Sequence, residues 1–159
     1  LLALTPSALN PSNTKKSTKA FTLLLLPKAR PSTMTITRSD NVTRHYVGTR
    51  VSEIAIHNGT VYLAGQIPEN SPGADMRVQT EEVLGHVERL LNEAGSSKAH
   101  ILMCQIFIRD AADIAVMNAV WDAWVVPGHT PPRATVVAPA INPGYLIEVI
   151  VTAAQIPAA

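Results

Sequence analysis

The sequence predicts one α+β domain whose elements follow the order β-β-α-β-α-β-β, with two helices on one face of a mixed sheet. Two observations predict it. Runs rich in β-branched residues alternate with two segments whose apolar residues recur at helical spacing. The chain of 159 residues is 47% apolar, which is enough for one hydrophobic core and no more. Such an order of elements packs as a helical layer on a sheet.

Two β-rich runs open the predicted domain. Ser52 to His57 and Thr60 to Ala64 are separated by Asn58-Gly59, the strongest two-residue hairpin signal because both residues tolerate a positive φ. The stretch from Gly65 to Pro68 ends the second strand, and Pro68 to Gly73 is expected to be a loop.

The next two elements are a long helix and a buried strand. Between Asp75 and Ala94 the apolar residues fall on one helical face, and Gly95 is placed to cap the end. That face comprises Val83, Leu84, Val87, Leu90, Leu91 and Ala94. Ile101 to Ile108 is nearly continuous in apolar residues, as expected of a strand buried in a sheet.

A second helix and two strands complete the domain. Asp113 is expected to be the N-cap of the helix, and Pro127-Gly128 ends it. Its apolar stripe is Ile114, Met117, Trp121 and Trp124. Thr135 to Ala138 and Tyr145 to Ala154 supply the last strands. The uncovered sheet face, with Ile101, Leu146 and their neighbours, is too apolar for water, so self-association is expected.

The charge distribution separates residues 1–33 from residues 34–159. The first segment holds five Lys and Arg and no acid, while the second holds the other eight against all 12 acids. A basic, hydroxyl-rich leader is typical of a transit peptide, and the alternative is a non-native extension before Met34. The domain is therefore expected to span residues 34–159. We expect a cytoplasmic protein, or a mitochondrial or plastid one if the leader is genuine.

Several function classes have no support in the sequence. The acidic body lacks the basic stripe that tracks a phosphate backbone, and the apolar run of residues 20–26 is too short to span a membrane. No phosphate loop, nucleophile elbow or metal-ligand spacing occurs, so no cofactor or metal is expected. The single cysteine, Cys104, excludes an internal disulfide and lies among apolar residues, which favours a packing thiol over a nucleophile.

The candidate site centres on Arg133 and Glu148, near the ends of two predicted strands. Arginine presents a planar fork of donors that matches a carboxylate. A glutamate in an apolar strand must form an ion pair, become protonated or have a functional role. Gly65 allows a ligand to approach the backbone. Asn118 is a further possible donor. The alternatives are a surface arginine, a turn glycine and an exposed helix asparagine.

From Met34 onward the chain resembles the reactive intermediate deaminase (RidA) family, also described as endoribonuclease L-PSP or translation inhibitor proteins. Single motifs are weak, but the ordered set is strong. The matching segments are Arg50 to Glu53, Val61 to Pro68, the Gln79 helix ending at Gly95, Phe107 to Asp110 with Asp113, Met117-Asn118 to Trp124, Pro132 to Val136, and Ile147-Glu148.

The resemblance implies a chorismate-mutase-like, ferredoxin-like domain that forms a homotrimer with clefts between subunits. It also implies hydrolysis of enamines and imines such as 2-aminoacrylate to 2-keto acids and ammonia, a role in metabolite damage control. Arg133 would then bind the substrate carboxylate and Glu148 would orient the attacking water. Gly65, Asn118 and Thr135 would line the cleft.

The chain departs from the family pattern at three positions, which bear on substrate preference more than on reaction class. The tyrosine of the usual opening has no clear counterpart near Arg50-Val51, the serine before the glycine is Ala64, and a common cysteine is Thr135. Two rival functions stay open: a non-catalytic sensor of keto acids or amino acids, and an endoribonuclease. The acidic body and the lack of a base-stacking platform weigh against the second.

Overall fold

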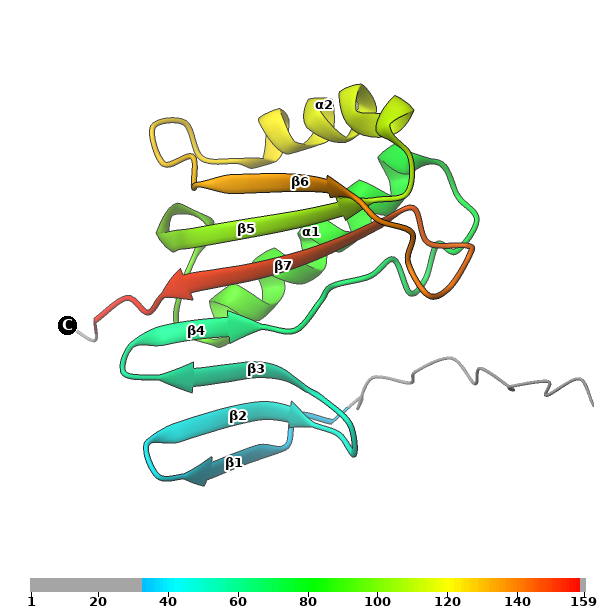
Figure 1. The fold of residues 1–159 in the computed structure, drawn as a ribbon. Coiled ribbons are helices and arrows are strands. Elements are labelled where there is room, and N and C mark those ends of the chain that lie inside the picture. The colour runs from blue at the N-terminus through cyan, green and yellow to red at the C-terminus, as the bar shows by residue number, and fades with distance from the viewer. Residues whose placement is uncertain (1–32, 158–159) are drawn as a thin grey trace, which may run out of the picture.

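The computed structural model describes residues 33–157, which form a seven-stranded mixed sheet with two α-helices. The spatial order is β1-β2-β3-β4-β7-β5-β6 (Figure 1). Only the β5–β6 pair is parallel among the strand pairs of this region. The strands are β1 (Ile36–Ser39), β2 (Val42–Val47), β3 (Ser52–His57), β4 (Thr60–Leu63), β5 (Ile101–Ile108), β6 (Arg133–Val137) and β7 (Ile147–Ala154). The predicted α+β class is confirmed.

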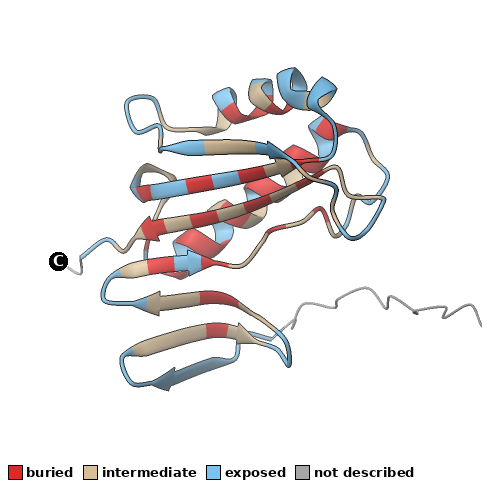
Figure 2. Cartoon of the chain, viewed as in Figure 1, coloured by how far each residue is buried: buried red, intermediate tan, exposed pale blue. Residues whose placement is uncertain are grey.

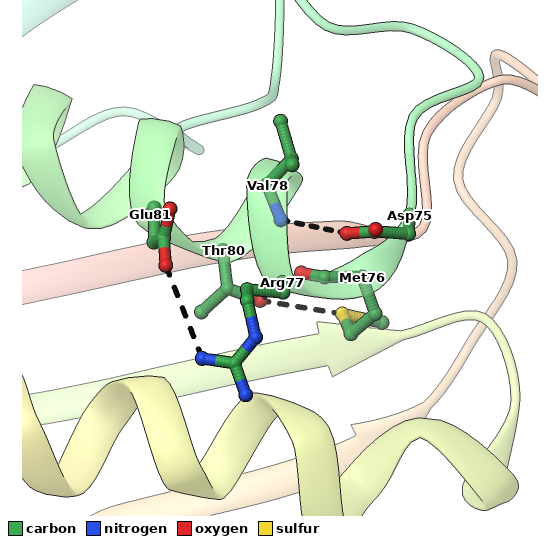
Figure 3. Close-up of polar contacts among 6 residues, drawn as sticks. All are labelled: Asp75, Met76, Arg77, Val78, Thr80 and Glu81. Atoms are coloured by element: carbon green, nitrogen blue, oxygen red, sulfur yellow. Dashed lines mark hydrogen bonds and ion pairs between the residues drawn. The ribbon is translucent and has the colours of Figure 1, made fainter.

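Both helices pack on the same face of the sheet, as Figure 1 shows. The first, α1 (Met76–Glu93), begins after Asp75, whose carboxylate accepts a hydrogen bond from the Val78 amide at 2.9 Å (Figure 3). The second is α2 (Ile114–Trp124). Short 3-10 helices, η1 (Lys98–His100) and η2 (Ala111–Asp113), flank β5. The predicted start and end of the long helix are therefore confirmed.

The core lies between the helices and one face of the sheet. Buried residues gather on α1, β5 and β7, whereas β1 is exposed along its length (Figure 2). Along β7, Ile147, Val149, Val151 and Ala153 are buried, and the residues between them are half-buried. This alternation means that one face of β7 packs against the helices while the other forms part of the open face of the sheet.

The hairpin formed by β1 and β2 was not predicted. Its turn is Asp40-Asn41, where both residues have a positive φ, and β1 carries one large apolar residue, Ile36, which is 47% exposed. Without a buried face the segment has no periodic hydrophobic signal. The predicted leader, residues 1–33, lies outside the described residues except for Thr33.

The predicted N-cap position of Asp113 in α2 is confirmed, although its side chain makes no capping hydrogen bond; Asp110 caps η2 by accepting from the Ala112 amide. Two smaller predictions are corrected by the structure. Ile114 is 43% exposed and lies outside the buried stripe. Ile101 is buried on the helical side, so it does not belong to the open face.

In residues 33–157 no helix is long and apolar enough to cross a membrane.

Candidate active site

Arg133 begins β6 and projects toward the helical layer. It pairs in register with Cys104 of β5, which is fully buried in the core between sheet and helices. Paired residues on neighbouring strands project to the same face, so the arginine side chain points to the side of α2. Because β6 is at the edge of the sheet, the side chain remains exposed.

Two residues of α2 hold the guanidinium group. Asn118 accepts a hydrogen bond from Arg133 Nη2 at 2.8 Å, and the guanidinium carbon lies 4.9 Å from the centre of the Trp121 ring. Trp121 is itself buried, with 5% exposure, and packs against Trp124 at a ring distance of 5.5 Å. An aromatic face and one hydrogen bond fix the plane of the guanidinium group. The exposed guanidinium fork is thus held in one orientation by α2.

Glu148 lies on the opposite, open face of the sheet. It pairs with Phe107, and its neighbours along β7, Ile147 and Val149, are buried on the helical side. Its carboxylate lies against the backbone of Gly65. A Cβ atom built on Gly65 would be 1.9 Å from Glu148 Oε1 and 2.9 Å from Cδ. Any side chain at position 65 would displace the carboxylate, which is the flexible end of the Glu148 side chain, from this position.

Hydrogen bonds on both sides of Gly65 hold its backbone in place. The Gln66 amide donates to the Val149 carbonyl at 2.8 Å, and the Val149 amide donates back at 3.0 Å. The fully buried Gln66 side chain donates to the Ala64 carbonyl at 2.8 Å and to the buried carboxylate of Glu53 at 3.3 Å. These contacts join the segment around Gly65 to Val149 of β7 and Glu53 of β3, next to Glu148.

Within one chain, the arginine and the glutamate are far apart. They lie on opposite faces, and their strands β6 and β7 flank β5. Their partners on β5, Cys104 and Phe107, are three positions apart, so strand geometry separates the two Cα atoms by roughly 14 Å. The sequence suggested a single small site, yet a molecule the size of an amino acid cannot contact both side chains of one chain.

The structure places Thr135 on the same face as Arg133, because it pairs with the buried Ile106. Its hydroxyl oxygen is inaccessible, and in the described part of the chain it has no hydrogen-bond partner. Cys104 is buried beneath Arg133. Burial raises the pKa of the Cys104 thiol to about 12, although the Arg133 charge acts in the opposite direction. The cysteine is therefore a neutral packing group at physiological pH, as its sequence context predicted.

A recess of about 220 Å³ opens on the face that carries Glu148. Phe107 and Ile150 line it from the sheet, and Leu146 lines it from the position just before β7. The segment after β6 supplies Ala138, Pro139 and Ala140. Among residues 33–157, no group of three or more His, Cys, Asp or Glu side chains is placed to hold a metal ion.

Sequence reasoning treated Trp121 only as a core residue and did not single out Gln66 or Glu53. A signal for Trp121 was present. It follows Asn118 by three positions on α2, and residues at this spacing share a helical face. The role of Gln66 had no such signal, because its bridge to Val149 joins segments distant in the sequence.

Comparison with known proteins places most of the domain in one family. The family model described as endoribonuclease L-PSP matches residues 43–155. The RutC family protein YoaB of Escherichia coli (strain K12) is 44% identical over 121 residues, 76% of this chain and 99% of that protein. A RutC family protein of Haemophilus ducreyi is 40% identical over 113 residues, covering 71% and 96% respectively.

A solved structure shares both sequence and fold. The crystal structure of NMB1025 from Neisseria meningitidis, a member of the YjgF protein family, has a TM-score of 0.70 and 42% identity. The match covers 74% of this chain and 97% of that chain. The resemblance inferred from the ordered motifs is thereby confirmed: the chain belongs to the endoribonuclease L-PSP family, which includes the RidA, YjgF and RutC proteins.

Proposed function

We propose that the protein is an imine and enamine deaminase, which hydrolyses reactive intermediates derived from amino acids to 2-keto acids and ammonia. The observation that supports this most is that the site combines a group suited to bind a carboxylate, Arg133, with a separate group suited to bind water, Glu148. An oriented guanidinium fork on Asn118 and Trp121 suits a carboxylate. A glutamate against the Gly65 backbone, in the wall of a recess, suits a water molecule.

The chemistry needs only these two groups. Arg133 binds the substrate carboxylate and fixes the position of the adjacent C=N carbon. Glu148 accepts a proton from water as its oxygen adds to that carbon, giving a carbinolamine. The same carboxyl group returns the proton to nitrogen. The C–N bond then breaks to release ammonia, while the carbinolamine hydroxyl gives its proton to the Glu148 carboxylate and becomes the carbonyl of the ketone. An iminium carbon is already electrophilic, so the step requires no covalent nucleophile.

We further propose that each site forms between two copies of the chain in a homotrimer. One copy supplies Arg133 and Asn118, and its neighbour supplies Gly65 and Glu148. Two features support this: the two groups cannot meet within one chain, and the open face exposes apolar residues, including Tyr62 (48% exposed) and Met103 (37%). Light scattering at micromolar concentration should show a trimer, and a stable monomer would contradict the shared site.

Ammonia release tests the activity directly. An amino-acid oxidase generates the imine, and hydrolysis is followed with and without the protein. Faster ammonia release with the wild-type chain supports a deaminase. Binding of a 2-keto acid without turnover supports a sensor instead, and cleavage of single-stranded RNA that survives Arg133→Ala supports an endoribonuclease.

Mixing two inactive variants tests the shared site. Arg133→Ala and Glu148→Gln are dissociated, combined in equal amounts and reassembled. If each site takes its arginine and glutamate from different copies, about a quarter of the sites regain both groups in a symmetric closed oligomer. If both groups come from one chain, activity stays at the level of the separate variants.

A further inference from the structure

The proposed catalytic step uses only the part of the recess next to Glu148, where a water molecule would bind, and leaves the rest of its volume without a role. The recess adjoins the glutamate on the open face, and its volume is about 220 Å³. Phe107 of β5 forms one wall of the recess. Ile150 of β7 and Leu146, just before β7, form another part of the lining. A substrate whose C=N carbon lies next to Glu148 has its side chain within reach of this recess.

The walls of the recess favour an apolar substrate side chain over a charged one. Seven of its eight lining residues are apolar, and the eighth is Glu148 itself. A charged substrate side chain would lose its hydration here and gain no opposite charge, apart from an ammonium group near Glu148. A carboxylate side chain would also be repelled by the glutamate.

The volume of the recess sets the size of the substrate side chain that it can hold. In another protein, an apolar cavity of about 150 Å³ holds a benzene molecule. The recess here is larger than that. It therefore accommodates a branched aliphatic or phenyl group, far more than the methyl group of an alanine-derived imine.

We propose that this recess is a side-chain pocket, and that the substrates are imines or enamines of amino acids with bulky apolar side chains. This inference rests on the proposed function and specifies its substrate class. A substrate would enter with its carboxylate on Arg133 of one copy and its side chain between Phe107 and the segment after β6 of the other.

Ala138 determines the size limit of the pocket. It directly follows β6. Val136 pairs with Phe107 on the open face, and Ala138, two residues later, lies on the same face. Its methyl group lines the recess together with Ala140, and Pro139 between them restricts the backbone. A larger residue at position 138 would project into the volume that the side chain of the substrate needs.

The experiment compares substrates within each variant. Imines generated from alanine, leucine, phenylalanine and glutamate are supplied to the wild-type oligomer, to Ala138→Leu and to Ala134→Leu. The control carries the same substitution on the same strand face, where Ala134 pairs with Gln105 and does not line the recess. The readout is the ratio of kcat/KM for the leucine imine to that for the alanine imine, with the oligomeric state measured in parallel.

The wild type should favour the leucine and phenylalanine imines over the glutamate imine. Ala138→Leu should lower the leucine-to-alanine ratio by about 10- to 200-fold, the range for a methylene-sized mismatch in an apolar pocket, and Ala134→Leu should leave it unchanged. Phe107→Ala widens the recess and should shift preference toward the phenylalanine imine. Unchanged ratios in both pocket variants overturn the pocket while leaving the deaminase intact. Hydrolysis of no imine by the wild type overturns the proposed function itself.

Discussion

The two halves of the candidate site are held in place by different means. Arg133 lies on an exposed edge strand and is oriented by side chains, Asn118 and Trp121, from a helix. Glu148 lies on β7, in the interior of the sheet, and its carboxylate lies against the backbone of Gly65, where no side chain intervenes.

The difference bears on how each half responds to change. Side-chain supports can be replaced one at a time, so the arginine half should lose function gradually. The glutamate half depends on a backbone position fixed by a two-way bridge between Gln66 and Val149, so it should respond sharply to the addition of a single methyl group. Four predictions test this contrast, from the largest effect to the smallest.

Glu148→Gln should lower kcat by about 10²- to 10⁴-fold, the usual loss when acid–base catalysis is removed. The amide keeps the shape of the side chain but cannot accept a proton. Binding of a 2-keto acid should change little, because Arg133 is untouched. Ammonia release and calorimetric binding measure the two effects. Glu81→Gln is the control, since Glu81 is an exposed glutamate on α1, and full activity of Glu148→Gln would remove the glutamate from the mechanism.

Arg133→Lys should lower kcat/KM by about 30- to 5,000-fold, equivalent to the 2–5 kcal/mol range for a disrupted hydrogen-bonded charge pair, here the pair that Arg133 would form with the carboxylate of a bound substrate. Lysine keeps the charge but lacks the planar fork that Trp121 and Asn118 orient. Steady-state kinetics with the leucine imine give the value. Arg77→Lys on the surface of α1 should match the wild type. Near-normal kinetics of the Arg133 variant would show that another group anchors the carboxylate.

Gly65→Ala should lower kcat by about 100-fold, as expected for a misplacement of about 1 Å in a catalytic group. Gly65 has no positive φ, and the atoms that must move belong to the end of the flexible Glu148 side chain, so the melting temperature should change little.

Gly85→Ala provides the matched control for this loss. Gly85 is in α1, where an added Cβ meets nothing within 4 Å, and alanine should raise the stability by about 0.5–1 kcal/mol with no change in turnover. Thermal unfolding measures the stability of both variants, and steady-state kinetics measure their kcat. An active Gly65→Ala enzyme would mean that the carboxylate position is not critical.

Trp121→Leu should raise KM by about two- to thirtyfold with a smaller effect on kcat, because a cation–π contact contributes roughly 0.5–2 kcal/mol. Trp121→Phe retains an aromatic face and should restore most of the affinity. Trp124→Leu is the control: this ring is in the same helix but contacts Lys98 at 5.3 Å and donates to Glu88 at 3.1 Å. Equal KM values in the two leucine variants would show that Trp121 serves packing alone.

The elements with a local signal were predicted well. The helix expected between Asp75 and Ala94, the Asn58-Gly59 hairpin and the strand Ile101–Ile108 all agree with the structure. In each of them, hydrophobic period and turn chemistry are properties of neighbouring residues. The β1–β2 hairpin was missed because it has one buried residue, His45, and hence no periodic pattern.

The sequence by itself determined which residues could act: one arginine after two prolines, one glutamate in an apolar strand, and a glycine at a strand end. Only the tertiary structure decided how they are arranged. Pairing with Cys104 turns Arg133 toward α2, and pairing with Phe107 turns Glu148 to the open face. The physical reason is that strand register has a period of two, so a shift of one residue moves a side chain to the other face. That choice depends on packing across the whole sheet.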